Sequence, residues 1–340
     1  MPKHAFTPVS GQIRRWVFDS PHLENRLGDP TLREVLTHIA PEGVAAIEAG
    51  GTLPVLIYLA PFTSSGPARA GWKAFGESLF QRHERLVQSG QMKPAILVMP
   101  DTFTSLGGNQ FVDSPVLGNW STWLSEALKP TLEAKYATNG NFALVGKSSG
   151  GYGAVVNAML KPGAWQGIAC HSGDMGFETM FMPTFAETLT HVAKYGTAAD
   201  YVDHVQEAAR LSGPDFHTLM ICAMAASYDP RKPTQDNPLG IELPVDATTA
   251  DIIDEAWREW LKFDPVEMIG DHHKNLQELD AMFIDCGGQD QYHIQYGSRK
   301  FVNLLSSYNV EHVWDEFPGT HSGIDHRLDL SFAYLTEKLS

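Results

Sequence analysis

The segment "GKSSG", residues 146–150, places serine hydroxyls between glycines in a way that suits two kinds of chemistry. It could end a phosphate-binding loop or form the turn that exposes a nucleophilic serine. A phosphate-binding loop of the G-x-x-x-x-G-K-[ST] type needs its first glycine five positions before the second. The residue five positions before Gly146 is Asn141, and the intervening "FALV" has the composition of a buried strand rather than a flexible loop. The sequence therefore argues against the phosphate-binding loop.

The same segment satisfies G-x-S-x-G, the pattern of a nucleophile elbow, with Ser148 at its centre. In such an elbow the serine lies on a strained turn between a strand and a helix, so its neighbours must be small. An apolar run precedes the turn, and the helix-like "GYGAVVNAMLK" follows it. The pattern predicts Ser148 as the nucleophile and the backbone N–H of Ser149 as a donor to an oxyanion hole, with Lys147 as the variable position. The alternative is a tight Gly/Ser turn without chemistry.

An activated serine needs a base, and the base needs a carboxylate that orients it. In α/β-hydrolases these residues follow in the order serine, acid, histidine. Asp290 lies just beyond the apolar run 281–288, and His321 lies in "FPGTH", after the short strand candidate 311–317. The order therefore predicts Asp290 as the acid and His321 as the base.

Both partners have rivals elsewhere in the chain. Asp285, inside the run 281–288, is the second choice for the acid, and Asp174 in "HSGD" is a further candidate. His326 and His293 are alternatives for the base.

The adjacent histidines in "DHH", residues 271–273, raise the question of a metal site. No further set of ligands accompanies them in the sequence. We therefore expect a solvated loop at 271–273, and neither a metal nor a cofactor in the protein.

Four apolar runs bounded by proline or glycine have the composition of strands that are buried on both faces. They are residues 54–60, 94–100, 142–146 and 281–288. Helix-like stretches, such as 119–136 and 298–309, alternate with them, which indicates an α/β sheet with crossover helices. Residues 33–41 have the pattern of an antiparallel strand that feeds the same sheet.

The region from about 175 to 265 differs, because its apolar residues have helical spacing and no strong strand interrupts it. We expect a mostly helical cap here, inserted into a single domain that spans residues 1–340. Its large apolar side chains form structural core or roof an acyl pocket; they are Met175, Met180, Phe181, Met182, Phe185, Trp257 and Trp260.

The charge balance argues against a nucleic-acid or anionic-membrane surface, because 40 acidic and 25 basic residues give a net charge of −15. No apolar stretch approaches the length of a membrane span or a secretory signal. The three cysteines are widely spaced, which favours buried, reduced thiols. We expect a cytoplasmic protein that acts on a small-molecule ester, as a monomer or a homodimer.

Together these segments resemble the putative-esterase family of α/β-hydrolases, which includes S-formylglutathione hydrolases, feruloyl and enterochelin esterases and mycolyltransferases. "GKSSGGYGA" (146–154) resembles the family's elbow G-x-S-x-G-G-x-G-A, and "CGGQD" and "FPGTH" resemble its late segments. "VLTHIAP", "PVLIYLAP", "ILVMPD" and "WLSEALKPTLEAKY" resemble its upstream blocks, in the same order. The resemblance implies an α/β-hydrolase fold with Ser148, Asp290 and His321 as nucleophile, acid and base.

The resemblance also places the second oxyanion donor after the strand that ends near Leu59. By position this donor is the N–H of Phe62, since Pro61 has none, and Thr63 is the alternative. The loop "PFTSSG" lacks the cysteine that S-formylglutathione hydrolases often carry here, which argues against that thioesterase activity.

The expected function is a serine carboxylesterase that acts through a Ser-His-Asp triad and an acyl-enzyme intermediate, without a cofactor. Acyl transfer to an alcohol would use the same triad, and the sequence does not separate the two reactions. An S-formylglutathione-type thioesterase and a peptidase are further alternatives. A catalytically silent binding protein with a hydrolase fold is another, although all three triad positions are filled.

Overall fold

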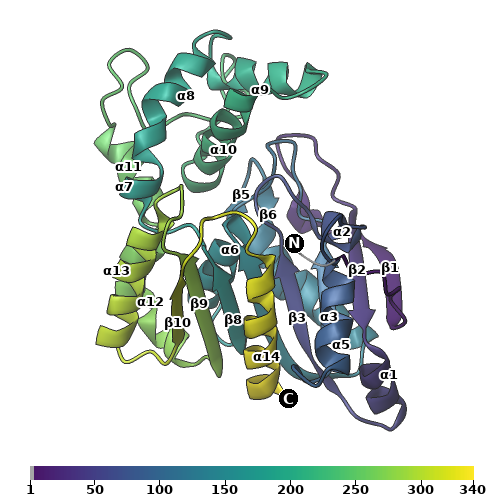
Figure 1. Cartoon of the computed structure of the whole chain (residues 1–340). Coiled ribbons are helices and arrows are strands. Elements are labelled where there is room, and N and C mark those ends of the chain that lie inside the picture. The colour runs from purple at the N-terminus through teal and green to yellow at the C-terminus, as the bar shows by residue number, and fades with distance from the viewer. Residues whose placement is uncertain (1–3) are drawn as a thin grey trace.

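A sheet of eight strands runs through the protein and separates two layers of helices (Figure 1). The structure is a computed structural model and describes residues 4–340. In spatial order the strands are β1 (Gln12–Phe18), β2 (Arg33–Ile39), β4 (Ile96–Pro100), β3 (Leu53–Leu59), β7 (Thr138–Lys147), β8 (Gly167–His171), β9 (Ala281–Gly287) and β10 (Val313–Phe317). Two short strands, β5 (Asp113–Ser114) and β6 (Gly118–Asn119), pair with each other outside this sheet.

The direction of the strands gives the sheet a mixed first third and a parallel remainder. Strand β2 pairs antiparallel with both β1 and β4, which confirms the antiparallel strand expected at 33–41. From β4 to β10 all neighbouring strands are parallel. The carboxyl ends of β3, β7, β8 and β9 therefore lie at one edge of the sheet, where the loops after parallel strands commonly carry the active site.

Alternate residues of the central strands enter two separate apolar cores. On β3, Val55, Ile57 and Leu59 join one core, while Leu56 and Tyr58 join the other. The first core includes α6 (Ser149–Leu160), α12 (Pro265–Gln277) and α13 (Ile294–Ser307). The second is covered by α3 (Leu79–Gln88) and α14 (Leu328–Leu339). Because both faces of the strands are covered, the continuous apolar runs in the sequence are explained.

Near the amino-terminal half the remaining helices are short. They are α1 (Pro41–Glu48), α2 (Gly66–Ala70), α4 (Trp120–Thr122) and α5 (Lys129–Lys135). A π-helical segment, Trp123–Leu128, joins α4 to α5, so the helix expected at 119–136 is continuous but not uniformly α-helical. Short 3-10 turns occur at Pro21–Leu23, Met182–Thr184 and Asp325–Arg327.

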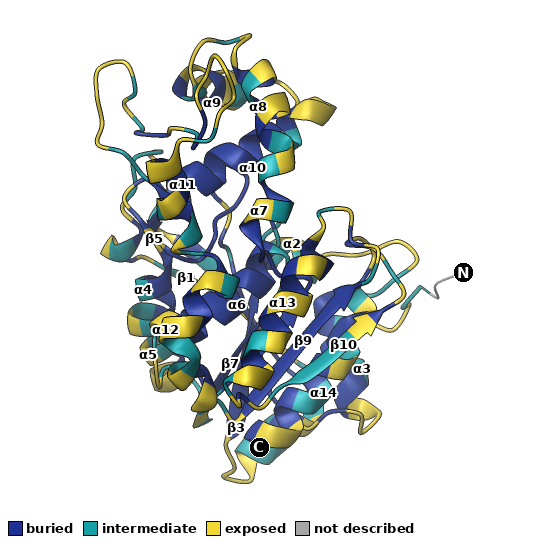
Figure 2. Cartoon of the chain, turned by 90° about the vertical axis from the view of Figure 1, so that its left-hand side faces the viewer, coloured by how far each residue is buried: buried dark blue, intermediate teal, exposed yellow. Residues whose placement is uncertain are grey.

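Five helices between β8 and α12 lie together above the carboxyl edge of the sheet (Figure 1). We refer to them as the cap helices, residues 177–261. They are α7 (Phe177–Met180), α8 (Phe185–Val192), α9 (Ala198–Glu207), α10 (Gly213–Tyr228) and α11 (Asp254–Leu261). Helix α10 is the most deeply covered of them, since its residues 218–228 are all buried (Figure 2).

Aromatic side chains hold the cap helices to one another. Phe181 and Phe185 each contact Trp260 edge-on, with ring centroids 5.8 Å apart, and Tyr228 stacks on Phe263 at 5.5 Å. Phe185 and Trp260 are buried in the main core, so they act in packing.

Two expectations from the sequence need correction. Residues 271–273 lie within helix α12 and not in a solvated loop. Strand β8 and edge strand β1 lie outside the segments expected as strands, because the apolar run in β8, residues 168–170, is only three residues long and β1 is mostly exposed.

The three cysteines are free and buried, as expected. No helix within residues 4–340 is long and apolar enough to cross a membrane.

Candidate active site

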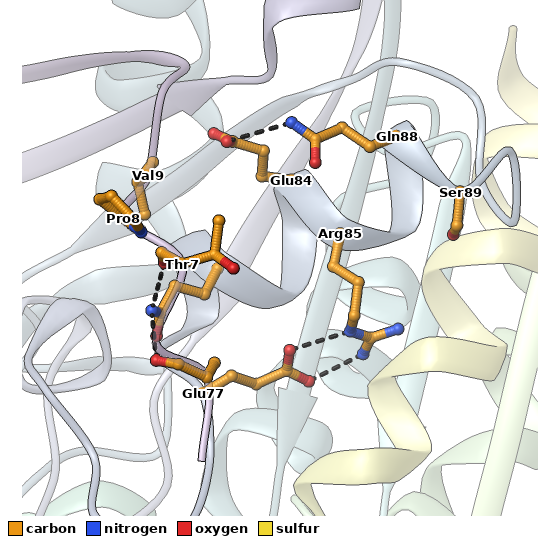
Figure 3. Close-up of a pocket in the computed structure, with 10 residues that line it drawn as sticks. Thr7, Pro8, Val9, Glu77, Glu84, Arg85, Gln88 and Ser89 are labelled. Carbon is orange, nitrogen blue, oxygen red and sulfur yellow. Dashed lines mark hydrogen bonds and ion pairs between the residues drawn. The ribbon is translucent and has the colours of Figure 1, made fainter. Parts of the chain in front are cut away.

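Two cavities of different character lie near the sheet. One, of about 370 Å³, lies between residues 5–9 and helix α3 (Figure 3). The carboxylates that line it are already engaged: Glu77 pairs with Arg85, and Glu84 accepts a hydrogen bond from Gln88. This cavity is therefore a gap in the packing of the amino-terminal segment. The other, of about 190 Å³, contains Ser148 and His321 in its wall.

Ser148 lies on the sharp turn between β7 and α6. Its backbone has φ 56° and ψ −127°, a conformation that residues other than glycine rarely adopt. Its N–H donates to the carbonyl oxygen of His171 at 3.0 Å, which ties the turn to the end of the neighbouring strand β8. The turn therefore has the geometry that the G-x-S-x-G pattern requires.

The flanking glycines are needed because the backbone passes very close to its neighbours. A Cβ atom at Gly146 would lie 2.3 Å from the carbonyl carbon of Gly150. A Cβ atom at Gly150 would lie 2.0 Å from the carbonyl oxygen of Leu59. Any side chain at these two positions would push the turn away from β3.

His321 and Asp290 lie on two loops at the carboxyl edge of the sheet, after β10 and β9. Asp290 Oδ2 lies 2.8 Å from His321 Nδ1, and Oδ1 accepts the N–H of Tyr292 at 2.9 Å. Both side chains are buried. A carboxylate can only accept, so Nδ1 carries the proton and Nε2 is left as the basic nitrogen.

Hydrogen bonds hold these two loops together. The N–H of Gln289 donates to the carbonyl of Gly319 at 2.9 Å, and the N–H of His321 donates to Gln291 Oε1 at 2.9 Å. The ring of Tyr292 lies edge-on to the imidazole of His321, with centroids 4.9 Å apart. The imidazole is thus held by Asp290, by the backbone hydrogen bond of His321 and by the ring of Tyr292.

Asp285, the alternative candidate for the acid, makes its hydrogen bonds outside the cavity of Ser148. Its Oδ1 lies 2.8 Å from His171 Nδ1, and its Oδ2 accepts from Arg327 Nε at 2.8 Å. The opposite nitrogen of His171 lies 2.8 Å from Ser331 Oγ. Asp285, His171 and Ser331 are fully buried, so this network joins β8, β9 and α14.

The rival histidines do not reach the cavity of Ser148. His293 precedes α13 and lies beside Tyr296, with ring centroids 6.3 Å apart. His326 lies beside Phe317, at 6.4 Å, and lines a different hollow near residues 4–7.

Asp174, the further candidate for the acid, contacts the nucleophile elbow itself. Its Oδ1 lies 3.4 Å from Ser148 Oγ, and its Oδ2 accepts from Ser149 Oγ at 3.4 Å. Gln110 Nε2 donates to the same Ser149 hydroxyl at 2.9 Å. Burial, with a smaller contribution from the charge of Asp290, raises the pKa of Asp174 to about 7. The sequence did not reveal this contact or Gln110, because β8 was missed and Gln110 lies in no recognisable motif.

The candidates for the oxyanion donors can be separated by their existing hydrogen bonds. The N–H of Thr63 donates to the carbonyl of Gly107 at 2.6 Å and is therefore occupied. Phe62 lines the cavity, and its ring lies edge-on to Phe216 at 5.7 Å. Ser149 is the first residue of α6, where backbone N–H groups have no acceptor within the helix.

The wall of the cavity is mostly apolar on the side of the cap helices. Met180, Phe216 and Met220 contribute from α7 and α10, and Phe62 from the loop after β3. Of the seven apolar cap residues singled out in the sequence, Met180 lines this cavity.

Lys147, the variable position of the elbow pattern, also lines the cavity. Burial lowers the pKa of its ammonium group, while nearby Asp325 acts in the opposite direction. Lys147 is thus a part of the cavity wall.

No group of three or more His, Cys, Asp or Glu side chains suited to a metal ion occurs within residues 4–340. His273, from "DHH", instead donates from Nδ1 to the carbonyl oxygen of Gly270 at 3.0 Å and stacks on Tyr308 at 4.3 Å.

Comparison with known proteins identifies the family of the chain. The model of the family described as "Putative esterase" matches residues 39–334. No curated protein sequence matches the chain significantly.

Solved structures with the same fold cover nearly the whole chain at low identity. A ferulic acid esterase is 16% identical with a TM-score of 0.59, over 97% of this chain and 99% of that one. The S-formylglutathione hydrolase from Agrobacterium tumefaciens is 14% identical with a TM-score of 0.58, over 98% of both chains. FphF, a fluorophosphonate-binding serine hydrolase from Staphylococcus aureus, is 11% identical with a TM-score of 0.56, over 96% of this chain and 98% of that one.

The family match covers most of the sequence, and the strand order and the elbow after β7 are those of an α/β-hydrolase. The chain therefore belongs to the putative esterase family, and it is an ester hydrolase with the α/β-hydrolase fold.

Proposed function

We propose that the protein is a serine carboxylesterase for esters with small acyl groups, with Ser148 as nucleophile, His321 as base and Asp290 as acid. The observation that carries the proposal is that Ser148, on its strained elbow, shares a cavity with His321, whose Nδ1 is held by Asp290 at 2.8 Å. Nucleophile, base and orienting carboxylate are thus assembled from the loops after three parallel strands.

In the proposed reaction Ser148 Oγ attacks the ester carbonyl while His321 Nε2 takes its proton. The N–H groups of Ser149 and Phe62 hold the developing oxyanion, each contributing ~3 kcal/mol. The alcohol leaves with the proton from His321, and an acyl group stays on Ser148. Water then gives a proton to His321 as it attacks the acyl carbon, and His321 returns that proton to Ser148 Oγ as the bond to the acyl group breaks and the acid is released. Asp290 keeps the imidazole in the correct tautomer and stabilises its charged form.

The size and lining of the cavity support the choice of substrate class. About 190 Å³ lies below the usual range of ~300–1,000 Å³ for pockets that take drug-sized ligands. Met180, Phe216 and Met220 offer apolar contact to a short acyl chain. We therefore expect acetyl and butyryl esters to be better substrates than octanoyl esters.

Ser148→Ala is the direct test, measured with p-nitrophenyl acetate, butyrate and octanoate. We expect kcat/KM to fall by at least ~10³-fold, because the covalent step is lost. Retained hydrolysis in this variant would show that the proposed nucleophile is wrong.

An alcohol acceptor in the same assay separates hydrolysis from acyl transfer. We expect the free acid to be the main product. A new ester as the main product in excess water would make the protein an acyltransferase. A matched thioester tests the alternative leaving group, and we expect no preference for it.

A further inference from the structure

A buried carboxyl group that the triad mechanism does not use contacts the nucleophile. Asp174 follows β8 and is 1% exposed. Its two oxygens lie at the hydroxyls of Ser148 and Ser149, each at 3.4 Å. A carboxyl group in this position affects where the proton of Ser148 points.

The hydrogen bonds around Asp174 have a direction that can be followed from donor to acceptor. Gln110 Nε2 donates to Ser149 Oγ, at 2.9 Å. A hydroxyl has one proton, and Ser149 uses it toward Asp174 Oδ2. The remaining question is which partner donates between Asp174 Oδ1 and Ser148 Oγ.

The two protonation states of Asp174 answer this question in opposite ways. An ionised carboxylate can only accept, so it would hold the single proton of Ser148 and compete for it with His321 Nε2. A neutral carboxyl can donate from Oδ1 to Ser148 Oγ, which leaves the proton of Ser148 free for His321. The neutral form therefore favours proton transfer from Ser148 to His321, whereas the ionised form opposes it.

We propose that Asp174 is a positioning residue that acts in its protonated form, donating a hydrogen bond to Ser148 Oγ so that the proton of Ser148 is directed to His321. This inference rests on the proposed role of Ser148 as nucleophile. No bond to Asp174 forms or breaks in the reaction, and its proton stays on the carboxyl group.

The surroundings of Asp174 favour the neutral form. Burial is the main cause of its raised pKa of about 7, and the carboxylate of Asp290 adds to the effect. Lys147 acts in the opposite direction, and the two serine hydroxyls also lower the pKa. The other titratable groups whose charges interact with Asp174 are uncharged at neutral pH because burial raises their pKa; they are Tyr152, Tyr228, Tyr292 and Cys170.

The test compares Asp174→Asn with Asp174→Ala across a pH series, using p-nitrophenyl acetate. An asparagine can accept from Ser149 through its oxygen and donate to Ser148 through its nitrogen, as the neutral acid does. We expect wild-type kcat/KM to decline as the pH rises through the ionisation of Asp174. We expect Asp174→Asn to lack that decline, and its kcat to exceed that of Asp174→Ala by at least ~10-fold, equivalent to one hydrogen bond of ~1.4 kcal/mol.

Asp264→Asn is a matched control, because Asp264 is also a buried carboxyl group with a raised pKa. Its oxygens accept from the N–H groups of Gly176 and Phe177 and do not contact Ser148. This variant should keep the alkaline decline. Loss of the decline in Asp264→Asn as well would assign it to a general charge effect and overturn the proposal.

Two outcomes concern Asp174 alone, provided that Ser148→Ala is inactive. If Asp174→Asn is as slow as Asp174→Ala, a hydrogen bond donated to Ser148 Oγ does not assist the reaction and the proposal is wrong. If wild type and Asp174→Asn share one pH profile, Asp174 does not titrate in the reaction, and the proposal is equally wrong. Activity in Ser148→Ala would instead overturn the proposed function, and this role of Asp174 with it.

An infrared spectrum gives a readout that does not depend on turnover or on a folded alanine variant. Wild type below the ionisation should show the carbonyl band of a protonated, buried carboxyl group, and Asp174→Asn should lack it. A wild-type spectrum in which Asp174→Asn removes only a carboxylate band at every pH would contradict a protonated Asp174.

Discussion

At the scale of single residues, the protein holds Ser148, the proposed nucleophile, in a conformation that costs free energy. A non-glycine residue with the φ and ψ of Ser148 costs ~1–3 kcal/mol, and close packing of Gly146 and Gly150 keeps it there. This strain presents the hydroxyl at the turn, where the cavity lies. Stability and reactivity therefore oppose each other at Ser148.

Replacing Ser148 with glycine should relieve this strain. We expect Ser148→Gly to be more stable than Ser148→Ala by ~1–2 kcal/mol in urea unfolding, because glycine tolerates a positive φ. At Ser149, in helix α6, the same pair of substitutions should give the opposite order, since alanine favours a helix. A Ser148→Gly variant no more stable than Ser148→Ala would argue against a strained elbow.

Substitutions of the two candidate acids, Asp290 and Asp285, should change different properties of the protein. Asp290→Asn should lower kcat by ~10⁴-fold with little change in unfolding, because the tautomer of His321 is lost. Asp285→Asn should mainly lower the free energy of unfolding, by ~3 kcal/mol, because the buried charge of Arg327 loses a partner. Measurements of kcat and of urea unfolding for both variants decide which aspartate is the acid. A large loss of kcat in a folded Asp285→Asn would identify Asp285 as the acid.

At the scale of elements, the sheet carries the proposed reacting groups while the cap helices line the cavity proposed for the substrate. The loops after β7, β9 and β10 carry Ser148, Asp290 and His321. Helix α10 contributes Phe216 and Met220 to the cavity, and its other face enters the core. Changes on α10 should therefore alter specificity without touching the reacting groups.

Met220→Ala should enlarge the cavity and move the preference toward longer acyl chains. We expect the ratio of kcat/KM for p-nitrophenyl octanoate to that for the acetate to rise ~10-fold, within the range for small changes in an apolar pocket. Met224→Ala, on the same helix and fully buried away from the cavity, is the control. Both variants should lose ~2–5 kcal/mol of stability, but only the first should change the ratio. Equal ratios in the two variants would show that α10 does not shape the acyl pocket.

At the scale of the whole molecule, buried histidines link stability to pH. His38 Nδ1 lies 2.7 Å from His83 Nδ1 between β2 and α3, and burial lowers the pKa of both rings. The unfolded chain binds these protons near pH 6.5, but the folded protein does not. Stability from these groups is present above that pH and is lost as the pH falls, at up to ~1.4 kcal/mol per unit for each histidine.

His83→Asn should reduce this acid sensitivity. We expect the free energy of unfolding to change less between pH 7 and pH 5 in this variant than in wild type. The contribution of Asp174 has the opposite sign, because its raised pKa favours folding at lower pH, but it is common to both proteins. Equal slopes in urea unfolding at the two pH values would show that His83 is not the titrating group.

The sequence allowed the prediction of features that depend on local patterns. Continuous apolar runs identified β3, β4, β7 and β9, and two motifs and chain order led to Asp290 and His321. Features set by contacts between distant segments were not predictable. Examples are the hydrogen bond of Thr63 to Gly107, which occupies one oxyanion candidate, and the contact of Asp174 with Ser148. The helix at 271–273 could not be predicted from local pattern, because residues 270–275 contain no apolar side chain that would mark a helical period.

The buried network of Asp285, His171 and Ser331 has a consequence for recognising enzymes by geometry. Its Asp–His distance is 2.8 Å, the same as that of Asp290 and His321, and it ends on a serine hydroxyl. A three-residue template matched on atom types and distances would select this network, inside a protein that also carries the proposed catalytic triad. Solvent access separates the two, because the hydroxyl of Ser331 has no room beside it for a carbonyl carbon.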